Sequence, residues 1–263
     1  MTASLQISQD PRGIVTMTLN RPEVHNTFDA SLIASITDHL QRLDADETVR
    51  IIVLSGVGRS FSAGADLNWM RSTANYDQQR NLEDAQKLAE MMSLLNRLTK
   101  PTIARINGPA YGGGVGLIAC CDIAIAVQSA RFALTEVRLG LVPAVISPYV
   151  VACIGQRQAR RFFLTGEPIS AALAEAIGLL HQVVADDELD AAVERTVEFL
   201  LLGGPQALAH CKELIRTVHF DNNLSDALIF HTAEVISELR VSAEGQEGLT
   251  AFLQKRPPYW RRK

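Results

Sequence analysis

The chain has 263 residues, of which 47% are apolar and 21% are charged. These proportions are typical of a folded globular protein and exclude a mainly disordered chain. The formal net charge is −4, so there is no overall positive field that would gather nucleic acid. The four cysteines form no CxxC pair. With no signal-peptide pattern and no long uncharged apolar run, we expect a cytoplasmic protein with reduced thiols and no membrane span.

Strand and helix patterns alternate through the first half of the chain. After Asp29, an expected N-cap, apolar residues recur at helical spacing, and they do so again over residues 88–95. The alternation predicts an α/β layer with crossover connections between parallel strands. The runs that predict strands are residues 14–19, 51–55, 102–106 and 123–127.

The last third of the chain shows helical patterns and no predicted strand after residue 135. An apolar stripe covers residues 189–200, and Pro205 stands at a favoured first helical position. Two more helices are predicted over 224–239 and 247–253. We therefore expect a β/α core domain over residues 1–190 and a helical section over 191–263, which packs against a partner subunit because a few helices alone enclose little core.

Two glycine-bearing turns follow predicted strands. Residues 60–68 read SFSAGADLN, and residues 107–122 read NGPAYGGGVGLIACCD. In α/β sheets, sites form at the carboxyl ends of strands. Three glycines at a helix start leave backbone N–H groups accessible to an anion, or to an oxygen that becomes anionic in a reaction. Tight packing is the alternative. The spacing matches neither GxGxxG nor a P-loop.

Five segments in order resemble the enoyl-CoA hydratase/isomerase (crotonase) superfamily. They read LNRPEVHN at 19–26, FSAGADL at 61–67, INGPAYGGGVGLIACCD at 106–122, FALTEVRLGL at 132–141 and AFLQKRP at 251–257. Within the superfamily, LGLVPAVISPYV at 139–150 is similar to the methylglutaconyl-CoA hydratase branch, which includes relatives acting on isohexenylglutaconyl-CoA. The resemblance implies an α/β crotonase-like spiral with a helical C-terminal trimerisation section. It also implies a hydratase that assembles as a trimer or a dimer of trimers.

The resemblance assigns roles to three residues. The backbone N–H groups of Ala65 and Gly113 match the family's oxyanion hole, and Glu136 matches its second catalytic glutamate. Adding water beside a thioester builds enolate charge on the carbonyl oxygen, which fixed donors stabilise, and it also requires a group that moves protons. Without the resemblance, Glu136 is interpreted as a solvated residue that starts a helix after Thr135.

One position departs from the family pattern. Many hydratases of the family carry another glutamate three residues past the middle glycine, where this chain has Gly116. Three alternatives follow from this difference. Glu136 handles both proton transfers through one water, or the substrate's distal carboxylate helps to position that water, or the enzyme is an isomerase that needs a single base.

The resemblance also implies residues that bind CoA, which would enter as part of the substrate and not as a bound cofactor. Asp66 has an alternative role as a helix N-cap, and Lys255 has one as a solvated helix end. Arg71 is a candidate partner for a distal carboxylate. The expected CoA-binding residues are Ala63, Asp66, Leu67 and Gly112, with Phe252 and Lys255 reaching a neighbouring subunit's site.

Other chemistries are disfavoured by the sequence. The six histidines show no HxxxH or HxH spacing, so no metal site is expected. RNA binding is an alternative of another class. The basic stretches that could bind RNA are residues 157–161 and 255–263, and both are short in a net acidic chain. Neither nucleic acid nor a membrane is therefore an expected partner.

Overall fold

The computed structural model describes residues 3–220 and 224–261. The strands are β1 (Leu5–Gln9), β2 (Ile14–Leu19), β3 (Ile51–Gly56), β4 (Thr102–Ile106), β5 (Ala110–Tyr111), β6 (Ile123–Val127), β7 (Arg131–Ala133), β8 (Ile169–Ser170) and β9 (Gln182–Val184). The α-helices are α1 (Ala30–Ala45), α2 (Leu67–Thr73), α3 (Gln78–Arg97), α4 (Gly113–Cys120), α5 (Ser147–Thr165), α6 (Ala171–Ala176), α7 (Leu189–Leu202), α8 (Pro205–Phe220), α9 (Asp226–Val241) and α10 (Ala243–Leu253). Short 3-10 turns are η1 (Pro22–Val24), η2 (Glu136–Leu139), η3 (Asp186–Glu188) and η4 (Tyr259–Arg261).

The chain divides into two compact units. The first comprises residues 1–98 and 102–194, and the second comprises residues 99–101 and 195–263. The boundary expected from the sequence, between the β/α core domain and the helical section, lies at residues 190–191. Among residues 3–220 and 224–261, no helix combines the length and the apolar composition needed to cross a membrane.

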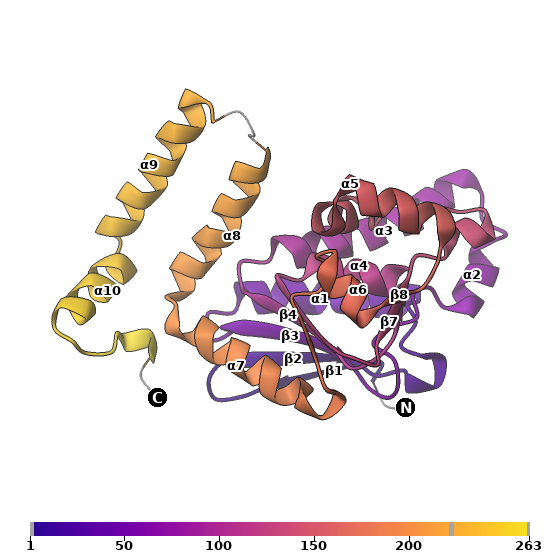
Figure 1. The fold of residues 1–263 in the computed structure, drawn as a ribbon, viewed down its shortest axis with the longest axis horizontal. Coiled ribbons are helices and arrows are strands. Elements are labelled where there is room, and N and C mark those ends of the chain that lie inside the picture. The colour runs from indigo at the N-terminus through magenta and orange to yellow at the C-terminus, as the bar shows by residue number, and fades with distance from the viewer. Residues whose placement is uncertain (1–2, 221–223, 262–263) are drawn as a thin grey trace. The chain divides into compact units, whose positions relative to one another are not determined.

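A six-stranded sheet forms the centre of the first unit, with strand order β1-β2-β3-β4-β6-β9. β1 pairs antiparallel with β2, and every later neighbour is parallel, as crossover connections require. Helices α1, α3 and α4 lie over one face of this sheet (Figure 1). The face of α1 that carries Leu32, Ile36 and Leu40 is buried, because these residues recur at the helical period.

A second, small sheet has the order β5-β7-β8. Its strands contain two or three residues each, too few for the alternation by which strands are recognised in a sequence. The prediction of no strand after residue 135 is wrong, because β8 and β9 both lie beyond it. The helix α5 was not predicted either, and its helical geometry breaks at Gly155, where φ is +70°.

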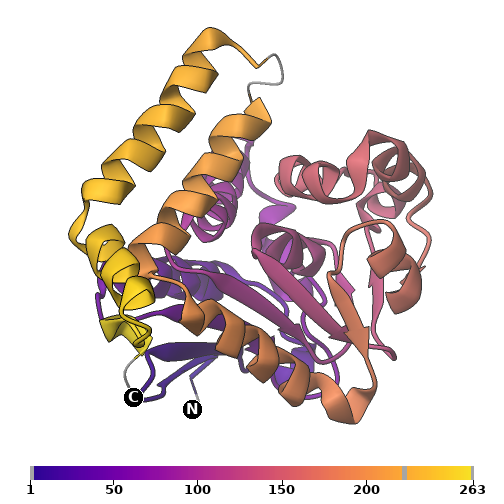
Figure 2. The same ribbon diagram turned by 60° about the vertical axis from the view of Figure 1, so that its left-hand side comes forward.

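The second unit contains the helices α8, α9 and α10. Figure 2 shows α8 and α9 as an antiparallel pair, and α10 packs against both. Pro205 is the first residue of α8, as predicted. Glu244 of α10 is buried, and its carboxylate accepts the N–H groups of Gln206 and Ala207 at the start of α8. A buried acid at a helix N-terminus satisfies donors that have no partner within the helix.

Candidate active site

The two glycine-bearing turns meet at one edge of the main sheet. Each follows a strand, β3 or β4, and these two strands are parallel neighbours whose carboxyl ends share an edge. Ser62 in the first turn bridges to Ala110 in the second, and Tyr111 donates its N–H to the Ser62 carbonyl at 2.9 Å. Gly64 has a φ of +84°, and a Cβ placed on it would lie 2.8 Å from the Tyr111 carbonyl oxygen in the second turn. The approach of the two turns therefore depends on glycine at position 64.

Each turn presents one backbone N–H group at this edge of the sheet. Within the described residues, 3–220 and 224–261, nothing accepts a hydrogen bond from the N–H of Ala65 or of Gly113. Gly113 is the first residue of α4, where helical N–H groups lack intrahelical partners. These groups provide two donors from adjoining turns for an oxygen that gains negative charge.

The small sheet brings Glu136 to the glycine triplet. β5 pairs with β7, and Gly112 donates its N–H to the Ala133 carbonyl at 2.9 Å. Glu136 follows three residues after Ala133, as the first residue of η2. A Cβ on Gly112 would lie 3.0 Å from Glu136 Oε1, and Gly112 has a φ of +49°. Glycine at position 112 therefore provides both the turn and the space for the carboxylate.

One oxygen of the Glu136 carboxylate is shielded from water. The side chain is half-buried, and Oε2 is buried without a hydrogen-bond partner among the residues that the structure describes. Burial raises the pKa of Glu136, and a hydrogen bond to its own backbone offsets part of the rise. Glu136 does start a short helix after Thr135, but the interpretation of a solvated residue is wrong. A carboxylate with an unpaired oxygen and a raised pKa suits proton transfer.

A stability prediction follows from the raised pKa of Glu136. In the unfolded chain the pKa of the Glu136 carboxyl returns to its ordinary value of 4.5. Between pH 4.5 and the higher pKa of the folded state, the folded protein therefore binds a proton that the unfolded chain has released. Stability from this group is present below pH 4.5 and is lost as the pH rises through the folded pKa. Glu136→Gln is therefore expected to raise Tm at neutral pH, and the gain is expected to shrink below pH 4.5 in calorimetry. An unchanged Tm of Glu136→Gln at neutral pH would contradict this expectation. Glu188→Gln, the same change at an exposed position, is the control.

Gly116 is covered by another side chain. A Cβ at this position would lie 2.2 Å from Ile146 Cγ2 and 3.2 Å from Met92 Cε. Ile146 is only 3% exposed, so it has little room to move. A glutamate at position 116 is thus incompatible with this packing, and the place that a second carboxylate would need is occupied by apolar atoms.

The contact between Gly116 and Ile146 makes a further stability prediction. Gly116→Ala is expected to lower the free energy of unfolding by roughly 1–3 kcal/mol through overpacking. In Gly116→Ala/Ile146→Ala, the loss should be smaller than the sum of the two single losses by roughly 0.5–3 kcal/mol. Urea unfolding measures all three variants. Ile154→Ala, in the helix α5 that Ile146 precedes as N-cap residue, is also buried and is the control expected to combine additively with Gly116→Ala. If the losses in free energy of unfolding of Gly116→Ala and Ile146→Ala simply added in the double variant, the contact between these residues would be contradicted.

Known proteins resemble this chain over nearly its whole length. The profile of the enoyl-CoA hydratase/isomerase family matches residues 9–263. The chain belongs to this family. A crystal structure of an enoyl-CoA hydratase from Shewanella pealeana has 44% identity and a TM-score of 0.95 over 98% of this chain and 96% of that one.

Two curated relatives in the family differ in reaction. The enoyl-CoA hydratase ACTT6 of Alternaria alternata is 38% identical over 91% of this chain and 78% of its own length. The 1,2-epoxyphenylacetyl-CoA isomerase of Escherichia coli is 31% identical over 96% of each chain. The crotonase-like fold predicted from sequence is confirmed by these matches. The family acts on CoA thioesters, and its members include both hydratases and isomerases.

The CoA-binding residues expected from the family resemblance have different environments in the SAGAD turn. Ala63 donates its N–H to the His25 carbonyl at 2.9 Å, and Leu67 is 70% exposed. Asp66 is buried, and its carboxylate accepts from the N–H groups of Asn68 and Trp69. The alternative role of Asp66 as the N-cap of α2 is therefore confirmed. Burial by itself would raise the pKa of Asp66, but its hydrogen bonds and the nearby Arg21 hold that pKa below the ordinary value.

The remaining expected residues lie elsewhere in the chain. Phe252 and Lys255 lie in the second unit, and both are exposed, Phe252 by 81%. Arg71 is exposed on α2 and donates to the Asn68 side chain at 3.4 Å. Exposure at these positions is compatible with contacts to a ligand or to another subunit.

Two side chains that shape this edge of the sheet were not predicted from the sequence. Ile146 packs on Gly116, and a Cβ on Gly113 would lie 2.8 Å from the ring of Phe28. Both contacts join residues at least 30 positions apart, so no local pattern signals them. Ile146 had appeared only within the run at 139–150 that carries part of the family resemblance, and Phe28 lay outside every quoted motif.

Proposed function

We propose that this protein is a hydro-lyase that adds water to a branched glutaconyl-type CoA thioester, 3-methylglutaconyl-CoA or isohexenylglutaconyl-CoA. The observation that carries the proposal is the position of Glu136. Among residues 3–220 and 224–261, neither Oε2 of its half-buried carboxylate nor the N–H of Gly113 in the adjoining glycine turn has a hydrogen-bond partner. The glutaconyl acyl group is inferred from the run at 139–150, which resembles the methylglutaconyl-CoA hydratase branch.

In this proposal, the N–H groups of Ala65 and Gly113 bind the thioester oxygen. Glu136, ionised, takes a proton from water while the water oxygen bonds to the β-carbon. The electron pair of the double bond moves toward the thioester, and the resulting enolate charge is stabilised by the two N–H groups. Glu136 then returns the proton to the α-carbon, so one carboxylate completes the addition without a second acid.

An isomerase is the second candidate, and the covered glycine at position 116 favours it. A base that removes a proton from one carbon and returns it to another needs one carboxylate and no water. Glu136 meets that need, and Ile146 leaves no room for a second acid at position 116. The two reactions differ in whether the product gains the mass of water.

We also propose that CoA enters only as part of the substrate and that the chain self-associates, as a trimer or a dimer of trimers. Large apolar side chains are exposed along α9 and α10 of the second unit, where water contact is unfavourable. Phe252 and Lys255 would then meet the CoA of a neighbouring subunit. The exposed residues include Ile229, Phe230, Ile236, Val241, Leu249, Phe252 and Leu253.

Mass spectrometry of a panel of thioesters tests the reaction. The protein is incubated with methylglutaconyl-CoA, isohexenylglutaconyl-CoA and straight-chain enoyl-CoA esters, and the masses of the products are measured. Gain of one water on a glutaconyl ester supports the hydratase, whereas rearrangement without a mass change supports the isomerase. Turnover of straight-chain esters alone would contradict the proposed glutaconyl acyl group.

Analytical ultracentrifugation tests assembly, and a monomer at micromolar concentration would contradict self-association.

A further inference from the structure

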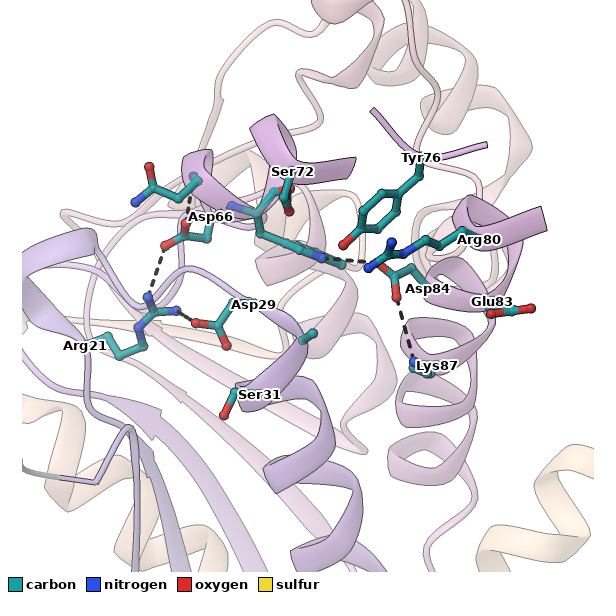
Figure 3. A pocket seen from close by; sticks show the side chains of 13 residues that line it. Arg21, Asp29, Ser31, Asp66, Ser72, Tyr76, Arg80, Glu83, Asp84 and Lys87 are labelled. Atoms are coloured by element: carbon teal, nitrogen blue, oxygen red, sulfur yellow. Dashed lines mark hydrogen bonds and ion pairs between the residues drawn. The ribbon is translucent and has the colours of Figure 1, made fainter. Parts of the chain in front are cut away.

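Two segments that carry site residues are held together by one guanidinium group. Arg21 Nη1 lies 2.9 Å from Asp29 Oδ2, and Nη2 lies 3.1 Å from Asp66 Oδ2. The same Nη1 donates to the Thr27 carbonyl at 2.9 Å. Figure 3 shows Arg21 between these two carboxylates, on the wall of a pocket of about 610 Å³.

Both carboxylates that Arg21 joins are helix N-caps. Asp29 accepts the Leu32 N–H at the start of α1, and Asp66 caps α2. The Arg21 side chain is 19% exposed and that of Asp66 is 7% exposed. Asp29 is more exposed, at 34%, but Arg21 and Asp66 are largely removed from water, so removing the guanidinium leaves the Asp66 carboxylate without its charged partner. Arg21 therefore fixes the starts of both helices relative to each other.

The same two segments orient the N–H of Ala65. Phe28 donates its N–H to the Gly64 carbonyl at 2.7 Å, and Asp66 donates its own to the Phe28 carbonyl at 2.8 Å. The Gly64 carbonyl and the Ala65 N–H belong to one planar trans peptide, so they point in opposite directions. Holding that carbonyl against Phe28 turns the Ala65 N–H away from Phe28.

We infer that Arg21 is a positioning residue that sets the direction of the Ala65 N–H by joining Asp29 to Asp66. It does not touch the thioester. Losing the guanidinium lets the segment before α1 and the turn before α2 separate, and the donor then points less well at the oxygen. This inference rests on the proposed function, in which that N–H binds the thioester oxygen.

Kinetics of Arg21 variants test the inference on the ester that the wild-type protein turns over. Because a displacement of about 1 Å can cost up to about 100-fold in rate, Arg21→Gln is expected to lower kcat roughly 10- to 100-fold. Its KM should stay near the wild-type value. Arg21→Lys keeps the charge without the two-pronged geometry and should restore only part of the rate. A kcat of Arg21→Gln within about twofold of wild type would overturn the inference.

Arg12→Gln is the matched control. Arg12 also joins two carboxylates, those of Asp10 and Glu194, in the first unit. Its loss should leave kcat unchanged even where Tm falls. If Arg12→Gln lowers kcat as much as Arg21→Gln at a similar Tm, general destabilisation explains the effect and the inference fails.

A spectroscopic readout separates this inference from the proposed function. The probe is saturated 3-methylglutaryl-CoA, isotopically labelled at the thioester carbonyl, which cannot be hydrated. Binding to the wild-type protein should lower the infrared stretching frequency of that carbonyl, and Arg21→Gln should return it toward the free value. If the wild type polarises the carbonyl but turns over no glutaconyl ester, the proposed substrate fails while the inference stands. A frequency lowered equally in both proteins would overturn the inference alone, whereas a free-value frequency in both would overturn the role of the Ala65 N–H and the inference with it.

Discussion

Replacing Glu136 by glutamine is expected to lower kcat by roughly 100- to 10,000-fold, the usual contribution of a general acid–base group. Glutamine has nearly the same shape as glutamate, so the fold and the fit against Gly112 should be retained. It cannot accept a proton from water or from a carbon acid. The loss should therefore appear in kcat, with KM near the wild-type value.

The pH profile gives this prediction a second test. Glu136 must be ionised to act as a base, and burial raises its pKa above the ordinary 4.5. In the wild type, kcat should rise with pH through a limb that lies above that value, and the limb should vanish from the residual activity of Glu136→Gln. Glu188→Gln makes the same chemical change at an exposed position and should leave the profile unchanged. Turnover above about a tenth of wild type in a folded Glu136→Gln protein would contradict the role.

Much of the sheet was predictable because its strands obey local rules. β2, β4 and β6 begin and end where the sequence analysis placed them, and β3 extends one residue further. These strands are buried runs bounded by turn residues. Asp29 and Asp66 also occupy the N-cap positions that the sequence allowed for them. Capping depends on side chains within three residues, so the information is local.

The arrangement of the candidate site was less predictable because it depends on contacts between distant segments. The pairing of β5 with β7 carries Glu136 to Gly112, yet two- and three-residue strands have no readable pattern. The covering of Gly116 by Ile146 is equally invisible, since it is decided by how α5 packs on α4. The family resemblance pointed to Glu136, Ala65 and Gly113, whereas the sequence alone left the glycine turns open to a packing role.

Gly113→Pro is expected to lower kcat roughly 100- to 1,000-fold, because it removes one donor of the proposed oxyanion hole. Proline is well tolerated at the first position of a helix, where its missing N–H has no intrahelical partner. Gly113 is the first residue of α4, so the helix should persist. The preceding residue is Gly112, which has no Cβ to clash with the proline ring.

Gly113→Ala is the matched control for the missing donor. Any side chain at this position meets the Phe28 ring, since a Cβ would lie 2.8 Å from Cε2. Alanine and proline share that clash, but alanine keeps the N–H group. The proline ring also places Cδ where the amide hydrogen lay, so the ratio of their kcat values measures the loss of the donor together with its replacement by carbon, and a 100-fold ratio corresponds to about 2.7 kcal/mol of transition-state stabilisation. Circular dichroism establishes that both variants fold. Equal kcat values in two folded variants would show that the Gly113 N–H does not bind the developing charge, and the proposed chemistry would then need another donor.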